Sequence, residues 1–127
     1  MEKKILLAAC ALGFLAIIFG AFGAHALKKI LSIEQLNSFE TGVKYQMYHA
    51  LFLLFIGTTQ IITLKEKAII FYLTVTGILF FSGSIYVLTT NGLTGIKSKL
   101  IGPITPIGGL ILILSWGYLF YAILSKK

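Results

Sequence analysis

The chain contains, at residues 5–24, the uncharged stretch ILLAACALGFLAIIFGAFGA. An α-helix rises about 1.5 Å per residue, so a helix of this length crosses the ~30 Å hydrocarbon core of a bilayer. Three further uncharged, mainly apolar stretches follow at Tyr45–Leu64, Ala68–Thr90 and Leu100–Ser125. The charged residues lie between these stretches and near the chain ends. The sequence therefore predicts an integral membrane protein.

Composition supports the same prediction. The chain is 57% hydrophobic and only 12% charged, and its mean hydropathy is +0.94, outside the usual range of soluble domains. A soluble fold would have to bury four helices that are apolar on all sides within 127 residues. The net charge of +7 comes from lysines alone. Because these lysines flank the apolar stretches, we expect anionic lipid headgroups, and not nucleic acid, as partners.

We expect an all-α, polytopic fold, with the whole chain forming a single membrane domain. Its four transmembrane helices should form a small bundle and span about residues 5–24, 45–64, 68–90 and 102–124. The run Lys3-Lys4 ahead of an apolar stretch also resembles a signal peptide. The apolar run continues well past Cys10, without a charge, as far as Ala24. We therefore expect this stretch to be a transmembrane helix that is not cleaved off.

The connections between the spans carry their own signals. Ser32 followed by Glu34 predicts a helix N-terminus, and the narrow apolar face that follows predicts a short helix lying in the membrane interface. Gly42 marks either the end of that helix or a point through which it continues into the second span. We expect a tight turn at Lys65–Lys67 and a loop at Asn91–Lys99.

An even number of crossings places both termini on one side of the membrane. Six lysines would lie on that side and five on the other, so the positive-inside rule barely discriminates. The lysine pairs next to the spans favour cytoplasmic termini, in a multi-pass protein of the cell (inner) membrane.

Small residues recur at helical spacing in the first span. Close approach of backbones supplies van der Waals contact between helices in lipid, where the hydrophobic effect is weak. We therefore expect helix packing at Ala9, Gly13, Ala16 and Gly20, and again at Gly108 and Gly109.

Polar residues within the predicted spans form a second pattern. On the predicted topology a set of them falls at one membrane level: His25, Lys44, Tyr45, His49, Ser82, Ser84, Tyr86 and Thr105, with Gln46 at its border. Polar groups in a bilayer are costly unless paired, so this cluster either fastens the helices or forms a binding site.

The two histidines admit three interpretations. Hydrogen-bonded structural residues are the commonest case, and a pH-responsive or ligand-binding pair is the next. Metal or haem ligation by His25 and His49 is the weakest, because a metal site usually needs three or four ligands, although a bis-histidine haem needs two. Ser82 and Ser84 have no acid or base at catalytic spacing. We expect no enzyme activity, metal or other cofactor. Trp116 fits an interfacial belt or helix packing.

Four ordered strings carry a family resemblance. They are GAFGAHAL at 20–27, FETGVKYQMYHAL at 39–51, FSGSIY at 81–86 and GPITPIGG at 102–109. Together they resemble the family called domain of unknown function 423. The resemblance implies a small four-helix protein of bacterial inner membranes, with relatives in mitochondria, and it implies no activity.

Two functional hypotheses follow. In the first, the protein is a structural or accessory component that assembles with itself or with a larger complex through its small-residue faces. In the second, it is a binding or transport module that takes a lipid, a proton or a small amphiphile at the polar cluster.

Overall fold

The computed structural model describes residues 1–90 and 101–127, and these are mainly helical. The first helical segment comprises α1 (Glu2–Ile18), the π-helical η1 (Phe19–Gly23) and α2 (Ala24–Leu27) in direct succession. Three long helices follow: α3 (Ile33–Thr58), α4 (Leu64–Thr89) and α7 (Ile104–Leu124). The predicted all-α class is confirmed. The predicted loop at 91–99 lies outside the described residues.

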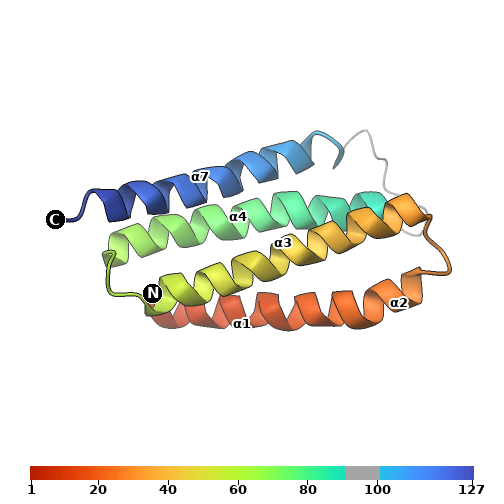
Figure 1. Ribbon diagram of the computed structural model, residues 1–127, viewed down its shortest axis with the longest axis horizontal. Coiled ribbons are helices and arrows are strands. Elements are labelled where there is room, and N and C mark those ends of the chain that lie inside the picture. Colours follow the sequence, from red (N-terminus) through yellow and green to blue (C-terminus); the bar gives the residue numbers. More distant parts are fainter. Residues whose placement is uncertain (91–100) are drawn as a thin grey trace.

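The long helices lie side by side, and the two chain ends lie at the same end of the molecule (Figure 1). α1 packs on α3, α3 on α4 and α4 on α7, with a smaller contact between α1 and α4. Buried apolar residues from all four helices meet towards the end that carries the termini, including Ile5, Leu53, Ile70 and Ala122. α3 and α4 are thus the central pair, flanked by α1 and α7.

α3 is a single helix of 26 residues, so the separate interfacial helix was wrong. It begins where Ser32 predicts. The Ser32 hydroxyl accepts from the Gln35 N–H, and the Gln35 side chain accepts from the Ser32 N–H. Gly42 does not end the helix. It lies against α4, and a Cβ at this position would be 3.0 Å from the Tyr86 ring. The glycine permits a close helix crossing, and the helix continues through it.

The connection between α3 and α4 also differs from its prediction. α3 ends at Thr58, and Thr63 caps α4 in a reciprocal arrangement with Glu66. The run Lys65–Lys67, predicted as a tight turn, therefore lies in the first turn of α4, because the capping box starts the helix before the lysines. Lys67 is only 2% exposed, and its Nζ lies 2.6 Å from a carboxylate oxygen of Glu2.

Three helical segments in the described part of the chain are long and apolar enough to cross a membrane: Glu2–Leu27, Leu64–Thr89 and Ile104–Leu124. α3 is as long as α4 but falls short in hydropathy. Its first half carries Glu34, Glu40 and Lys44, and polar side chains continue as far as His49. By length and hydropathy, three of the four long helical segments in the described residues are therefore candidate spans.

The predicted packing residues lie at contacts within the chain. Ala9 and Ala16 are each 1% exposed. A Cβ at Gly13 would lie 3.7 Å from the Ala50 Cβ, and one at Gly20 would lie 3.2 Å from Val43, so this stripe of α1 and η1 faces α3. Gly108 of α7 faces the backbone of α4 at Phe81. These small residues form seams between consecutive helices of one chain.

Candidate functional site

His49 lies half-way along the bundle. Gly13 of α1 faces Ala50, and the Gln46 side chain reaches the Leu12 carbonyl, so His49 is level with residues 12–13 of the segment Glu2–Leu27. It is also about 24 Å along the axis from the start of α3 at Ile33. The sequence prediction began this helix at Tyr45 and placed His49 near the headgroups. The observed helix starts three turns earlier, and this places His49 half-way along the bundle, a level called mid-depth below.

The His49 ring joins α3 to α7. Its Nε2 lies 3.1 Å from the indole Nε1 of Trp116, and its Nδ1 lies 2.7 Å from the Tyr45 carbonyl oxygen. An indole N–H can only donate, so Nε2 accepts and Nδ1 carries the proton. The residue is only 4% exposed and is neutral in this arrangement. Nε2 therefore fastens α3 to α7, while Nδ1 bonds within α3.

Gln46 joins three helices. Its Nε2 donates to the Leu12 carbonyl of α1 at 2.8 Å, and its Oε1 accepts from the Tyr86 hydroxyl of α4 at 2.6 Å. Gln46 is 3% exposed. The Tyr86 ring packs between Phe19 of the π-helical segment and Phe39 of α3, at centroid distances of 5.3 and 5.2 Å. The amide thus pairs with a hydroxyl of α4 and a backbone carbonyl of α1 in the interior.

Hydroxyl groups fasten the remaining seams. Ser82 donates to the Gly42 carbonyl at 2.8 Å, which joins α4 to α3. Ser84 bonds the Thr105 hydroxyl, and Thr74 bonds Ser115 at 2.6 Å, which joins α4 to α7 at two levels. Throughout residues 1–90 and 101–127, every buried side-chain nitrogen or oxygen has a hydrogen-bond partner.

The predicted single cluster is therefore divided. His25 lies in α2, twelve residues beyond Gly13, so it is about 18 Å along the bundle from the level of His49. The expectation that the two histidines share a level was wrong. Lys44 is exposed on α3, and its side chain hydrogen-bonds no described residue. The other predicted residues join neighbouring helices in pairs.

A groove between α3 and α7 opens beside His49. Its cavity has a volume of about 430 Å³. The floor is Phe81 of α4, and the walls come from α3 and α7; the lining residues are Tyr45, His49, Phe81, Gly109, Leu112, Ile113 and Trp116. The Tyr45 ring stacks on Phe81 at a centroid distance of 4.9 Å. Apart from the paired imidazole and indole N–H and the Tyr45 hydroxyl, this inner cavity is apolar.

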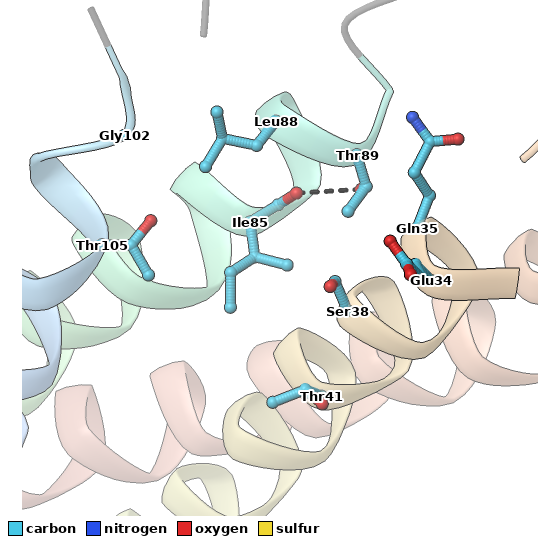
Figure 2. Close-up of a pocket in the computed structure, with 9 residues that line it drawn as sticks. All are labelled: Glu34, Gln35, Ser38, Thr41, Ile85, Leu88, Thr89, Gly102 and Thr105. Atoms are coloured by element: carbon cyan, nitrogen blue, oxygen red, sulfur yellow. Dashed lines mark hydrogen bonds between the residues drawn. The ribbon is translucent and has the colours of Figure 1, made fainter. Parts of the chain in front are cut away.

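A second cavity, of about 500 Å³, lies at the end of the bundle opposite the termini. Figure 2 shows Glu34, Ser38 and Thr41 of α3 along one side, with Thr105 of α7 across from them. Ile85 and Leu88 of α4 lie between these two sides (Figure 2). Gln35, Thr89 and Gly102 complete the lining. This outer cavity is polar on its walls and apolar on its floor.

The two cavities follow one another along the same three helices. Thr41 of the outer cavity lies one turn before Tyr45 of the inner one on α3. Likewise, Ile85 is one turn from Phe81 on α4, and Thr105 is one turn from Gly109 on α7. We call the combined feature the α3–α7 groove. Its outer cavity is polar at the walls, and its inner cavity, half-way along the bundle, is mainly apolar.

The sequence reasoning missed two residues that organise this region. Gln46 was placed only at the border of the polar cluster, yet it joins α1, α3 and α4. Trp116 was assigned to an interfacial belt or to packing, but its indole bonds the mid-depth histidine. An amide within an apolar helix was the available signal for Gln46. No comparable signal pairs Trp116 with His49, because they are 67 residues apart.

A family model described as "Protein of unknown function (DUF423)" matches residues 19–109. The chain belongs to the DUF423 family. The resemblance read from its sequence motifs is thereby confirmed. The match extends from the π-helical segment through α3 and α4 to the first turns of α7, and so includes most of the α3–α7 groove of this DUF423 protein.

Curated relatives of this DUF423 protein are named as membrane proteins. A UPF0382 membrane protein of Haemophilus influenzae is 34% identical over 127 residues, covering 100% of this chain and 98% of the relative. One from Staphylococcus saprophyticus is 42% identical over 102 residues, covering 80% of this chain and 81% of the relative. The inner membrane protein YgdD of Escherichia coli is 29% identical over 130 residues, covering 99% and 93%. No solved structure matches the chain.

Proposed function

We propose that this DUF423 protein is a four-span inner-membrane component, without catalytic activity, that holds an amphiphilic molecule in the α3–α7 groove. Membership in the family and the names of its relatives already support a membrane protein. The proposal rests on one observation: a polar cavity at the bundle end and an apolar cavity half-way along the bundle lie one helical turn apart on the same three helices.

The dimensions of the groove fit one leaflet. From Glu34 to His49 the helix advances fifteen residues, or about 22 Å. Half of the hydrocarbon core is about 15 Å thick, so the outer end lies at headgroup depth and the inner end lies near the midplane. The two cavity volumes fall within the usual range of roughly 300–1,000 Å³ for ligand sites.

Less supports the first hypothesis, in which the protein assembles with itself or with a larger complex through its small-residue faces. It relied on the small-residue faces at Ala9–Gly20 and Gly108–Gly109. Gly13 and Gly20 face α3, while Gly108 and Gly109 face Phe81, so these residues already serve contacts within one chain. The groove, in contrast, is lined but not filled by residues 1–90 and 101–127.

The four-span part of the proposal concerns α3. This helix is antiparallel to both α1 and α4 and packs on both of them (Figure 1). A buried α3 can carry Gln46 and His49 in the bilayer because their polar atoms are paired within the bundle. We expect tags at Met1 and Lys127 to be accessible from the same compartment in protease-protection experiments on intact cells. Termini on opposite sides would contradict four crossings.

The amphiphile proposal is tested with two glycines of α7. Gly109 lines the groove and Gly117 faces open space, so leucine at each adds the same side chain to the same helix. We expect Gly109→Leu to lower lipid retention about tenfold, because the inserted side chain displaces two or more methylene groups at ~0.8 kcal/mol each. Native mass spectrometry of protein extracted in mild detergent measures the retained lipid.

The matched variant Gly117→Leu should retain lipid as the wild type does. Circular dichroism of both variants checks that the helices are intact. Equal retention by Gly109→Leu and wild type would refute the groove as the binding site. If the wild-type protein instead carried a bound protein and no lipid, and Gly109→Leu alone lost that protein, the ligand of the groove would be a protein partner and not an amphiphile.

A further inference from the structure

The outer end of the α3–α7 groove has a distinctive charge. Among the described residues that line its two cavities, only Glu34 carries a formal charge with histidine neutral. Its carboxylate lies in the first turn of α3, beside Ser38 one turn further along (Figure 2). The lysines nearest in sequence, Lys28, Lys29 and Lys44, do not line the groove.

Hydrogen-bond donors accompany the carboxylate. Gln35 uses its Oε1 in the helix cap, so its amide N–H groups remain as donors. The Ser38 hydroxyl is exposed and bonds no other described residue. The negatively charged Glu34 carboxylate can accept hydrogen bonds, and the neutral Gln35 amide and Ser38 hydroxyl can donate them. All three lie on one wall within about one helical turn.

We infer that the α3–α7 groove selects amphiphiles whose headgroup carries a primary ammonium next to a phosphate, as in phosphatidylethanolamine. This inference rests on the proposed function and specifies its ligand. The ammonium would donate to the Glu34 carboxylate in a charge-assisted hydrogen bond, and Ser38 and Gln35 would donate to the phosphate oxygens. The acyl chain would lie along Phe81 and Leu112.

The groove differs in charge from the rest of the surface. The chain as a whole has a net charge of +7, which attracts anionic lipids around both ends of the bundle. Inside the groove, an anionic headgroup would meet the Glu34 carboxylate, and none of the described lining residues is a lysine. A choline headgroup has no N–H to donate to the carboxylate. The groove therefore favours ethanolamine over choline, and choline over glycerol.

The test uses the full chain in vesicles with equal amounts of phosphatidylethanolamine, phosphatidylcholine and phosphatidylglycerol carrying identical acyl chains. Native mass spectrometry of the extracted protein counts each bound lipid. We expect roughly a two- to five-fold enrichment of phosphatidylethanolamine, which is the range for one partly exposed charge pair. Glu34→Gln should abolish this enrichment, and Glu34→Lys should shift it towards phosphatidylglycerol. Glu40→Gln, which removes an exposed acid outside the groove on the same helix, should leave it unchanged.

Each outcome has a separate meaning. If Gly109→Leu loses lipid but the wild type binds the three lipids equally, the headgroup inference fails and the proposed function stands. If Glu40→Gln lowers the enrichment as much as Glu34→Gln does, general surface charge explains it, and the inference fails. If Gly109→Leu retains as much lipid as the wild type, the proposed function itself fails.

Discussion

Alanine at Gly108 is expected to destabilise the protein by about 3 kcal/mol. Gly108 lies where α7 crosses α4, and a Cβ there would overlap the backbone of Phe80 and Phe81, not a flexible side chain. Inserting an extra carbon into a packed interior costs about 1–3 kcal/mol when side chains can adjust. Here a helix would have to move, so we expect the upper end of that range. Unfolding by SDS in mixed micelles, followed by circular dichroism, measures the change.

Two other glycines of α7 serve as controls for this prediction. A Cβ at Gly109 would lie 3.6 Å from the Phe81 ring, an ordinary contact, and one at Gly117 would meet nothing within 4 Å. Alanine at either position should therefore change stability by much less than alanine at Gly108. A Gly108→Ala protein as stable as the Gly117→Ala protein would show that α4 and α7 do not cross at this point.

Leucine at Gln46 is expected to cost about 2 kcal/mol of stability. The substitution removes the bond to the Leu12 carbonyl and leaves the Tyr86 hydroxyl without its acceptor. An unsatisfied buried polar group costs about 1–3 kcal/mol, while a single interhelical bond in a membrane averages about 0.6 kcal/mol. The unpaired hydroxyl is thus the larger part of the expected loss. The same SDS titration measures it.

A double substitution separates the two parts. Tyr86→Phe removes the hydroxyl that Gln46→Leu leaves unpaired, so the double variant should be more stable than the sum of the two single effects predicts. The expected difference is about 1 kcal/mol. Strict additivity would mean that Gln46 and Tyr86 do not interact, and the hydrogen-bonded connection between α3 and α4 at this level would have to be abandoned.

The starts of α3 and α4 show how much of the fold can be predicted from local sequence. Ser32 predicts the beginning of α3, and the structure places the cap there. Thr63 and Glu66 form an equally good capping box, but the lysines around Glu66 suggested a turn instead. Gly42 could be interpreted in two ways from the sequence. Only the presence of α4 against it shows why a glycine is needed in mid-helix.

The candidate site depended more on tertiary structure. The polar residues themselves were visible, because they interrupt apolar stretches. Their position along the bundle was not, because a shift of the helix start from Tyr45 to Ile33 moved His49 several turns away from the end of its helix. The pairing of His49 with Trp116 and of Tyr86 with Gln46 joins residues 67 and 40 positions apart. No local pattern encodes such pairs.

By itself, the sequence determined that this chain is a helical membrane protein of the DUF423 family, because hydropathy and short motifs are local properties that survive without knowledge of packing. Tertiary structure decided which small residues face which helix, which polar groups pair, and where a groove remains between α3 and α7. The physical reason is that each of these depends on the register and rotation of one helix against another. Those are set by close packing across the whole bundle.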